Sequence, residues 1–256
     1  MYLKDARAIV TGGASGLGEA TVRKIVSSGG KAVIFDLNKE KANQLIAELG
    51  GGNVYFLATN VTNAREVEAN TNKAKGFLGT INMLINCAGI ATPGKVLSRK
   101  GVMELSQFEK VVQVNLIGTF NVIRVVSSHM EHNEENEEKE RGVIINTASV
   151  AAFEGQIGQA AYSASKGGVA SMTLPIAREF ASKGIRVMAI APGLFETPMF
   201  EELPESAKEA LGKSVPFPNR LGLAEEYARL VESIVTNPML NGEVIRLDGA
   251  IRMQPK

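Results

Sequence analysis

Short apolar runs alternate with longer helical segments along the whole of this chain. Seven runs have the length and composition of strands, at residues 6–10, 31–35, 54–58, 81–86, 143–147, 185–190 and 243–247. Six further segments have helical character, at residues 17–28, 39–49, 64–76, 108–129, 163–182 and 225–236. Strands that are connected through helices run parallel, and the helices cover both faces of their sheet. The alternation therefore predicts an α/β fold with a doubly wound, parallel, seven-stranded sheet flanked by helices.

The predicted strands and helices form one continuous unit. No low-complexity stretch divides the 256 residues, so we expect residues 1–256 to form a single domain. Hydrophobic residues make up 45% of the chain but aromatic residues only 5%, which indicates a core of Val, Ile, Leu and Ala. Such a core suits a parallel sheet packed between helices.

Charge and cysteine content exclude several classes of protein. The 28 basic and 27 acidic residues leave a formal charge of +1, which gives no long-range attraction to nucleic acid or to an anionic membrane. Cys87 is the only cysteine, so no intrachain disulfide can form and a reducing compartment is favoured. A strand-like run follows the amino terminus at once, without a secretory or transit sequence. We therefore expect a cytoplasmic protein, and the mitochondrial matrix stays open because internal targeting signals are hard to read.

Two segments interrupt the alternation. Residues 131–141 hold six glutamates, and we expect them to form a solvated surface loop. Residues 195–218 combine Pro and Glu with large apolar side chains and follow the carboxyl end of a strand, where open α/β sheets bind ligands, so we expect a substrate lid there. The histidines, His129 and His132, have no further nitrogen or sulfur ligand nearby, so we expect both to be solvent-exposed and expect no metal site.

A glycine-rich turn, Thr-Gly-Gly-Ala-Ser-Gly-Leu-Gly at residues 11–18, directly follows the first predicted strand. Glycines at such a turn let the backbone approach a pyrophosphate, which the helix amino terminus then stabilises. The spacing of Gly12, Gly16 and Gly18 differs from the common G-x-G-x-x-G, but its position favours a Rossmann-type dinucleotide site over a turn alone. Asp36 ends the second strand. A carboxylate there binds ribose hydroxyls and repels a 2′-phosphate, which favours NAD over NADP.

Tyr162 and Lys166 lie four residues apart in a predicted helix and therefore share one face of it. A free phenol, with a pKa of about 10, is a poor proton donor or acceptor near neutral pH. A nearby ammonium lowers the pKa of the phenol toward the value that suits a general acid–base. The pair alone is a weak signal, because most such pairs are solvated helix residues. Together with the glycine-rich turn and Asp36 it indicates an enzyme.

These motifs resemble those of the short-chain dehydrogenase/reductase family, over essentially the whole chain. The resemblance rests on residues 11–18, on Asn-Cys-Ala-Gly at residues 86–89, and on Asn115, Ser149, the Tyr162–Lys166 pair and Pro-Gly at residues 192–193. Residues 143–158, 191–198 and 241–254 further resemble the type 2 3-hydroxyacyl-CoA dehydrogenases, a group also described as 17β-hydroxysteroid dehydrogenase type 10.

The resemblance implies a role for each matching residue. Tyr162 exchanges a proton with the substrate oxygen, and Ser149 binds and orients the same oxygen. Lys166 binds the nicotinamide ribose and, with the cationic nicotinamide ring, lowers the pKa of Tyr162. Asn115 holds a water that links Lys166 to solvent, although an asparagine in a helix often only bonds nearby backbone. The implied cofactor-binding residues are Gly12, Ser15, Gly16, Leu17, Gly18, Asp36, Asn60, Val61, Cys87, Ala88, Gly89, Tyr162, Lys166, Pro192, Phe195 and Thr197. On the substrate side stand Ser149, Gln156 and Tyr162.

Three residues depart from the family pattern. Asn60 stands where an aspartate normally accepts a hydrogen bond from the adenine amino group. Since an amide carbonyl can also accept, we expect weakened adenine recognition. Cys87 replaces an asparagine, and we interpret it as a small apolar residue and not as a nucleophile. Glu196 occupies a lid position where a small residue is usual.

The leading hypothesis is therefore an NAD-dependent oxidoreductase that converts a 3-hydroxyacyl-CoA to the 3-oxoacyl-CoA. The alternatives are a hydroxysteroid or other alcohol dehydrogenase, a 3-oxoacyl thioester reductase, and a scaffold with a vestigial site. The cations Lys95, Arg99 and Lys100 in the polar segment 91–103 either meet the phosphates of a CoA ester or are solvated. The resemblance also implies a homotetramer, with the last strand and residues 251–256 near an interface.

Overall fold

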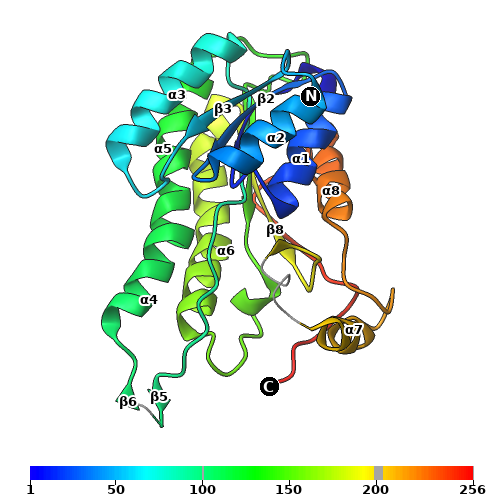
Figure 1. Cartoon of the computed structure of the whole chain (residues 1–256). Coiled ribbons are helices and arrows are strands. Elements are labelled where there is room, and N and C mark those ends of the chain that lie inside the picture. Colours follow the sequence, from blue (N-terminus) through cyan, green and yellow to red (C-terminus); the bar gives the residue numbers. More distant parts are fainter. Residues whose placement is uncertain (100, 199–203, 256) are drawn as a thin grey trace.

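The computed structural model describes residues 1–99, 101–198 and 204–255. Seven parallel strands form one sheet in the order β3-β2-β1-β4-β7-β8-β9 (Figure 1). The strands are β1 Arg7–Thr11, β2 Lys31–Asp36, β3 Val54–Ala58, β4 Met83–Asn86, β7 Gly142–Thr147, β8 Ile185–Pro192 and β9 Val244–Leu247. The order turns back between β1 and β4, so the expected doubly wound α/β fold is confirmed.

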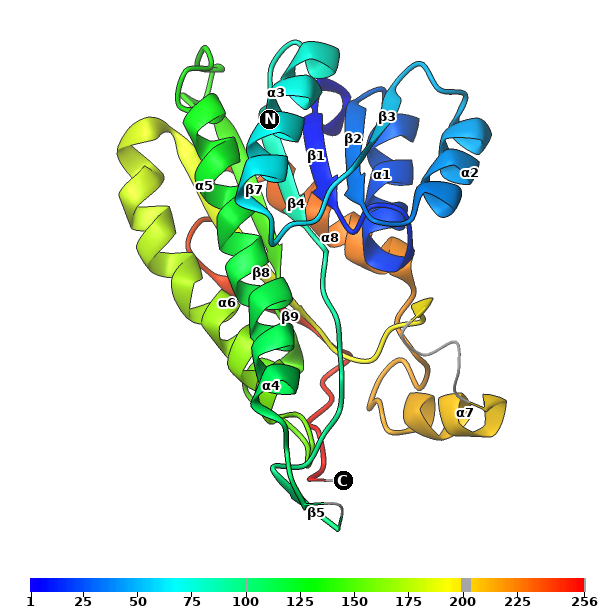
Figure 2. The ribbon, with the colours of Figure 1, turned by 60° about the vertical axis from the view of Figure 1, so that its left-hand side comes forward.

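Alternate residues of each strand enter different cores, because successive side chains of a strand point to opposite faces. In β1, Ala8 and Val10 pack in one core and Ile9 in the other. Helices α1 Gly16–Ser27, α2 Lys39–Leu49 and α8 Ala224–Thr236 cover the first face, and α3 Ala64–Leu78, α5 Thr119–Met130 and α6 Ala160–Phe180 cover the second (Figure 2).

Local signals set most helix boundaries. The side chains of Asn38 and Asn63 accept hydrogen bonds from the backbone N–H groups three residues on, which caps α2 and α3. Helix α2 ends at Gly50, whose φ of 82° is left-handed and favours glycine. Short helical turns occur at η1 Leu3–Asp5, η3 Val150–Ala152 and η4 Ala181–Lys183.

The single helix predicted at residues 108–129 is longer and is interrupted. Helix α4 spans Leu105–Val112, a π-helical stretch η2 spans Gln113–Gly118, and α5 continues from Thr119. The run Leu105–Met130 is long and apolar enough to cross a membrane by composition alone. However, 56% of its most apolar window is buried inside the fold, as in a core helix of a globular domain.

Two polar segments contain more secondary structure than the sequence indicated. In the expected lid, helix α7 spans Glu205–Lys213, while Met199, Phe200 and Leu203 lie outside the described residues. In segment 91–103 the strands β5 Leu97–Ser98 and β6 Gly101–Val102 pair as a hairpin that projects from the body (Figure 1). Lys100 and Lys256 also lie outside the described residues.

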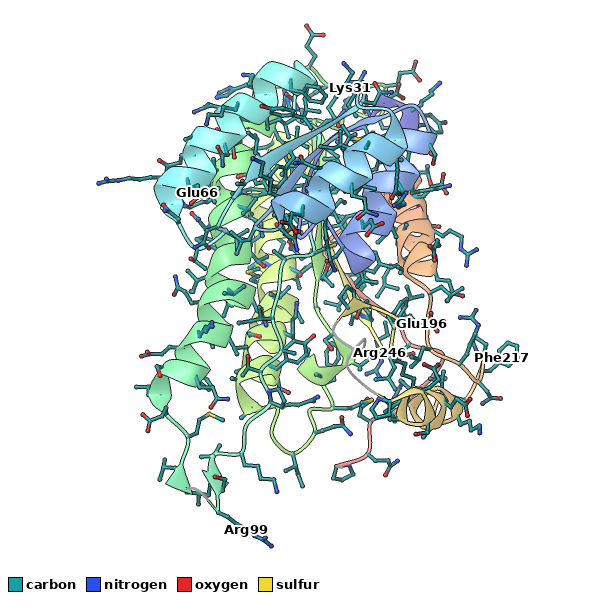
Figure 3. The ribbon with its side chains drawn as sticks, viewed as in Figure 1. Lys31, Glu66, Arg99, Glu196, Phe217 and Arg246 are labelled. Carbon is teal, nitrogen blue, oxygen red and sulfur yellow. The ribbon has the colours of Figure 1, made fainter. Side chains whose placement is uncertain are left out.

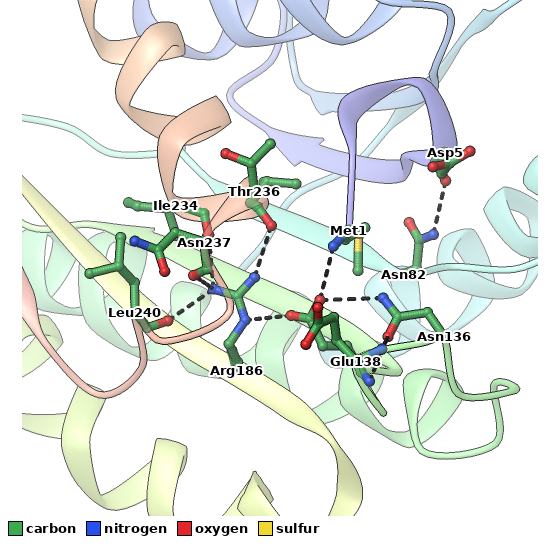
Figure 4. Close-up of polar contacts among 12 residues, drawn as sticks. Met1, Asp5, Asn82, Asn136, Glu138, Arg186, Ile234, Thr236, Asn237 and Leu240 are labelled. Atoms are coloured by element: carbon green, nitrogen blue, oxygen red, sulfur yellow. Dashed lines mark hydrogen bonds and ion pairs between the residues drawn. The ribbon is translucent and has the colours of Figure 1, made fainter.

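The prediction that residues 131–141 form a solvated loop is wrong for Glu140. This carboxylate is 6% exposed and binds the amino-terminal ammonium of Met1 and the guanidinium of Arg186. Arg186 in turn donates to the carbonyls of Ile234, Asn237 and Leu240 around the end of α8 (Figure 4). A run of charged residues predicts that the segment is exposed on average. It does not reveal which glutamate is buried, here Glu140, which pairs with the buried Arg186. His129 is also only partly exposed, and burial lowers the pKa of its imidazole.

Candidate active site

The predicted site residues converge at the carboxyl ends of β1, β4, β7 and β8. Thr11 at the end of β1 joins the first two of these strands, since its carbonyl accepts from the Cys87 N–H and its hydroxyl accepts from the Ala88 N–H. β7 pairs with β4 and β8, so Ser149, just beyond β7, lies between the cofactor motif and Pro192. In an open α/β sheet this edge, at the point where the strand order reverses, is where ligands bind.

The glycine-rich turn is packed so closely that side chains do not fit. A Cβ on Gly12 would lie 2.8 Å from the Ala88 nitrogen, and a Cβ on Gly18 would lie 2.2 Å from the Gly12 oxygen. Ser15 begins α1 without a side-chain hydrogen bond to the helix, so no side-chain cap occupies the first-turn N–H groups. These donors and the helix dipole suit an anionic group such as a pyrophosphate.

Asp36 lies beside this turn, as its position in the sequence predicted. One carboxylate oxygen accepts from the Ala14 N–H at 3.0 Å, and the other accepts from the Asn38 N–H at 2.9 Å. These bonds fix the carboxylate next to the turn and leave each oxygen a further lone pair for hydroxyl donors.

Asn60 differs from the sequence expectation. Its side-chain oxygen already accepts from both the N–H and the hydroxyl of Thr62, at 3.1 and 2.8 Å. An amide oxygen has two lone pairs, so the acceptor that we expected to be available for adenine is used locally. Val61 next to it is 7% exposed and packs on Gly118 of η2, where an added Cβ would lie 2.6 Å from the Val61 side chain.

Tyr162, Ser149 and Lys166 form the chemical centre of the site. Tyr162 and Lys166 project from the first two turns of α6, and the Ser149 hydroxyl lies next to the Tyr162 phenol and acts to lower the pKa of the phenol. The Lys166 ammonium lies 5.9 Å from the centre of the Tyr162 ring. The ammonium is 5% exposed, and it donates to the Thr147 carbonyl at 2.7 Å.

Lys166 does not lower the pKa of Tyr162 in this structure. Burial raises the pKa of the phenol, and the Ser149 hydroxyl opposes this only in part. Burial also lowers the pKa of Lys166, to about 8. The physical reason is direction: the ammonium points to the Thr147 carbonyl and not to the phenol oxygen.

Asn115 is fully buried within the π-helical stretch η2. Its side chain accepts from the Ile90 N–H at 2.8 Å and donates to the Ile90 carbonyl at 2.9 Å and to the Ser165 hydroxyl at 3.1 Å. The backbone-binding role that the sequence left open is therefore present. An ideal Cβ on Gly89 would lie within 3.6 Å of both the Asn115 side-chain oxygen and the Lys166 side-chain nitrogen. Asn115 and Lys166 therefore both lie next to the backbone at Gly89.

The lid arm reaches the cofactor turn. Phe195 is 5% exposed and packs on Gly222, and Thr197 lies about 3.5 Å from the position of a Cβ on Gly16. Glu196 is exposed and points into the space in front of the body (Figure 3). Glu196 and Thr197, together with the turn, border a cavity of about 590 Å³.

Gln156 lies apart from this cavity, on the loop between Ser149 and Tyr162. Its amide donates to the Gln254 carbonyl at 3.0 Å, which ties the loop to the carboxyl-terminal segment. A smaller cavity of about 350 Å³ adjoins Gln156.

The structure adds two residues that the sequence did not single out. Thr147 supplies the carbonyl that holds Lys166, and Tyr227 of α8 lies 2.8 Å from the Thr147 hydroxyl. Thr147 could have been found from its place two residues before Ser149, but Tyr227 carries no local signal. No group of three or more His, Cys, Asp or Glu side chains suited to a metal occurs within residues 1–99, 101–198 and 204–255.

Comparison with known proteins gives full-length matches. A family model described as short chain dehydrogenase matches residues 6–208. The chain is 54% identical over 255 residues to the 3-hydroxyacyl-CoA dehydrogenase type-2 of Homo sapiens, covering 99% of this chain and 97% of that protein. It is 51% identical over 255 residues to the protein of the same name from Drosophila melanogaster, covering 99% and 100%.

A solved structure is also similar. The crystal structure of 3-hydroxyacyl-CoA dehydrogenase type-2 from Mycobacterium avium superimposes with a TM-score of 0.94 at 42% identity, covering 99% of this chain and 98% of that one. The similarity thus extends over the site, the lid arm and the sheet alike.

Proposed function

Because the chain belongs to the short chain dehydrogenase family, whose members use NAD(P), we propose that it is an NAD-dependent 3-hydroxyacyl-CoA dehydrogenase. The observation that carries the proposal is the neighbouring Tyr162 and Ser149 hydroxyls with Lys166 buried behind them, at the sheet edge beside the glycine-rich turn. The substrate class follows the printed name of relatives that are 51–54% identical over nearly the whole chain.

The residues at the turn fit a dinucleotide. Gly12 and Gly18 allow close backbone approach, and the α1 amino terminus offers N–H donors to the pyrophosphate. Asp36 suits the free hydroxyls of an adenosine ribose, and its negative charge disfavours a 2′-phosphate at the same place. A nicotinamide held at this turn would supply the acceptor or donor of the hydride at the substrate carbon.

The side chains of this protein handle the proton and the orientation of the substrate. In oxidation, Tyr162 takes the proton of the substrate hydroxyl, and in reduction it returns one to the carbonyl oxygen. Ser149 donates a hydrogen bond to that oxygen and so stabilises the charge that develops on it. The Thr147 carbonyl holds the Lys166 ammonium behind Tyr162, and Asn115 keeps the backbone at Ile90 fixed beside it.

Substrate access fits the lid arm. Thr197 and α7 border the larger cavity next to the turn, while Gln156 borders the smaller cavity and binds the carboxyl-terminal segment at Gln254. We propose that the acyl chain enters between these two parts and that Lys95 and Arg99, both exposed, remain outside it. Arg99 points away from the body at the tip of the projecting hairpin (Figure 3).

The proposal extends to assembly and location. A homotetramer agrees with two exposed surfaces: the edge strand β9, whose residues are only half-buried, and the junction of η2 and α5, where Ile117 and Phe120 are 45% and 48% exposed. Two different self-complementary surfaces on one chain produce a closed tetramer. We place the protein in the cytoplasm, with the mitochondrial matrix as the alternative, and treat residues 1–256 as one domain.

The test is the absorbance at 340 nm of purified protein with acetoacetyl-CoA and either NADH or NADPH. We expect rapid loss with NADH and little with NADPH, and Tyr162→Phe should lower kcat by about 100-fold or more. Tyr55→Phe is the matched control, since Tyr55 lies on β3 and stacks on Phe77 away from the site. A preference for NADPH would contradict the role of Asp36, and near-full turnover by Tyr162→Phe would contradict the mechanism.

A further inference from the structure

Three side chains that the proposed mechanism does not use meet beneath the site. The Tyr227 hydroxyl lies 2.8 Å from the Thr147 hydroxyl, Thr147 donates to the Cys87 sulfur at 3.5 Å, and the Cys87 thiol donates to the Tyr227 oxygen at 3.7 Å. We call these residues the Cys87–Thr147–Tyr227 cluster. Cys87 directly follows β4, Thr147 ends β7 and Tyr227 lies in α8. Cys87 and Thr147 are 60 residues apart in the chain, and Thr147 and Tyr227 are 80 residues apart.

The cluster has one self-consistent arrangement of protons. Burial raises the pKa of Tyr227 well above 10 and also raises the pKa of Cys87, so both groups keep their protons at working pH. With Thr147 and Cys87 donating as described, the Tyr227 hydroxyl donates to Thr147 and closes the ring. Tyr227 is fully buried, and a buried phenol without a hydrogen-bond partner is destabilising.

The cluster is connected to the reacting groups through the backbone. Thr147, whose side chain belongs to the cluster, supplies the carbonyl that accepts from the Lys166 ammonium at 2.7 Å. Thr147 also stands two residues before Ser149 on the same strand end. Cys87 begins the turn whose next N–H group, at Ala88, donates to Thr11 beside the cofactor motif. The cluster therefore connects the carboxyl ends of β4 and β7, which both carry residues of the site.

Packing alone does not account for a tyrosine here. A phenylalanine would fill the same apolar space between α8 and the sheet, where Val231 and Ile234 of α8 are also buried. The hydroxyl adds only the bonds to Thr147 and Cys87. The Tyr227 hydroxyl therefore contributes mainly by fixing the orientation of the Thr147 side chain.

We propose that Tyr227 is a positioning residue for the reaction: its hydroxyl fixes Thr147, and the Thr147 carbonyl in turn holds the Lys166 ammonium beside Tyr162. The inference rests on the proposed dehydrogenase function. Without the Tyr227 hydroxyl the Thr147 side chain rotates between alternatives, and the strand end that carries the Lys166 acceptor loses one of its fixed contacts.

The experiment compares Tyr227→Phe, Thr147→Val, the double variant and Thr147→Ser in acetoacetyl-CoA reduction with NADH at 25 °C. We expect Tyr227→Phe and Thr147→Val each to lower kcat about fivefold to tenfold, with KM for acetoacetyl-CoA changed less than twofold. The double variant should lose no more than the worse single variant, because both remove the same bond. Thr147→Ser keeps the hydroxyl and should restore most of kcat.

A purely structural role predicts a different result: the melting temperature falls while kcat of the folded variants stays at the unsubstituted level. Tyr55→Phe controls for loss of a tyrosine hydroxyl elsewhere. If Tyr227→Phe does not fold, Thr147→Val against Thr147→Ser decides in the same way. Absence of turnover in the unsubstituted protein would overturn the proposed function and this inference with it, whereas unchanged kcat in Tyr227→Phe and Thr147→Val overturns the inference alone.

Discussion

At the scale of single residues, the site holds two buried titratable groups whose pKa values are shifted in opposite directions. Burial raises the pKa of the Tyr162 phenol and lowers that of the Lys166 ammonium to about 8. In each case the neutral form is favoured, because a low-dielectric environment disfavours charge. The phenol therefore holds its proton more firmly than the ammonium does.

The lowered pKa of Lys166 predicts the pH dependence of reduction. Below pH 8 the ammonium is charged and Tyr162 is protonated, which is the state that donates a proton to a ketone. As the pH rises through 8, Lys166 loses its charge, so kcat/KM for NADH, which reports on the free enzyme, should fall. Steady-state rates between pH 6 and 10 measure this. A profile that stays flat up to pH 10 would contradict the assignment.

Asn60 predicts a gain of cofactor affinity by substitution. Its side-chain oxygen is occupied by Thr62, so the group that remains is an N–H donor. Asn60→Asp keeps an acceptor for Thr62 and adds one for the adenine amino group. We expect the Kd for NADH to fall by about fivefold, the value of one added hydrogen bond. Fluorescence titration measures it, with Asn63→Asp, an exposed helix cap with the same charge change, as the control. Equal Kd values for Asn60→Asp and the unsubstituted protein would place the adenine elsewhere.

At the scale of elements, the end of α8 depends on one buried ion pair. Arg186 of β8 donates to carbonyls at the end of α8. The Glu140 carboxylate pairs with two cations, the Arg186 guanidinium and the Met1 ammonium (Figure 4). Burial raises the pKa of Glu140, but the hydrogen bonds and the charge of Arg186 outweigh this and leave the pKa lowered. The helix that carries Tyr227 is thus anchored at its far end by groups from three separate segments.

This pair predicts acid sensitivity. Since the Glu140 pKa is lower in the folded than in the unfolded chain, its contribution to the free energy of unfolding is full above about pH 4.5 and is lost as the pH falls below it. Glu140→Gln should lower stability at pH 7 by about 3–5 kcal/mol, because Arg186 remains buried and unpaired. Urea unfolding at pH 7 and pH 4 measures both effects, with the exposed Glu137→Gln as the control. If Glu140→Gln is as stable as the control at pH 7, the Glu140–Arg186 pair does not contribute to the free energy of unfolding.

At the scale of the whole molecule, the exposed apolar side chains on α5 predict assembly. Phe120 is 48% exposed on a helix whose other face is buried in the fold. A glutamate in a self-complementary interface faces its own copy, so like charges oppose association. Phe120→Glu should halve the mass measured by sedimentation velocity, while Tyr2→Glu, also exposed, should leave the tetramer intact. An unsubstituted chain that sediments as a monomer would rule out the tetramer.

The sequence by itself determined the sheet, its helices and the main chemical groups of the site. Strand and helix periods are local properties, and so is the spacing that puts Tyr162 and Lys166 on one face of α6. The glycines of the turn and Asp36 were also predictable, because each follows directly from the end of a strand. Helix α7 was missed, since its short segment carries no clear apolar period.

Only the tertiary structure decided how these groups are held. The acceptor of Lys166, the pairing of Glu140 with Arg186, the use of the Asn60 oxygen and the contact of Tyr227 with Thr147 all depend on direction and burial. Tyr227 and Thr147 are 80 residues apart, and no local period links them. Hydrogen bonds and pKa values respond to atoms within a few ångströms, and it is the fold that sets which atoms those are.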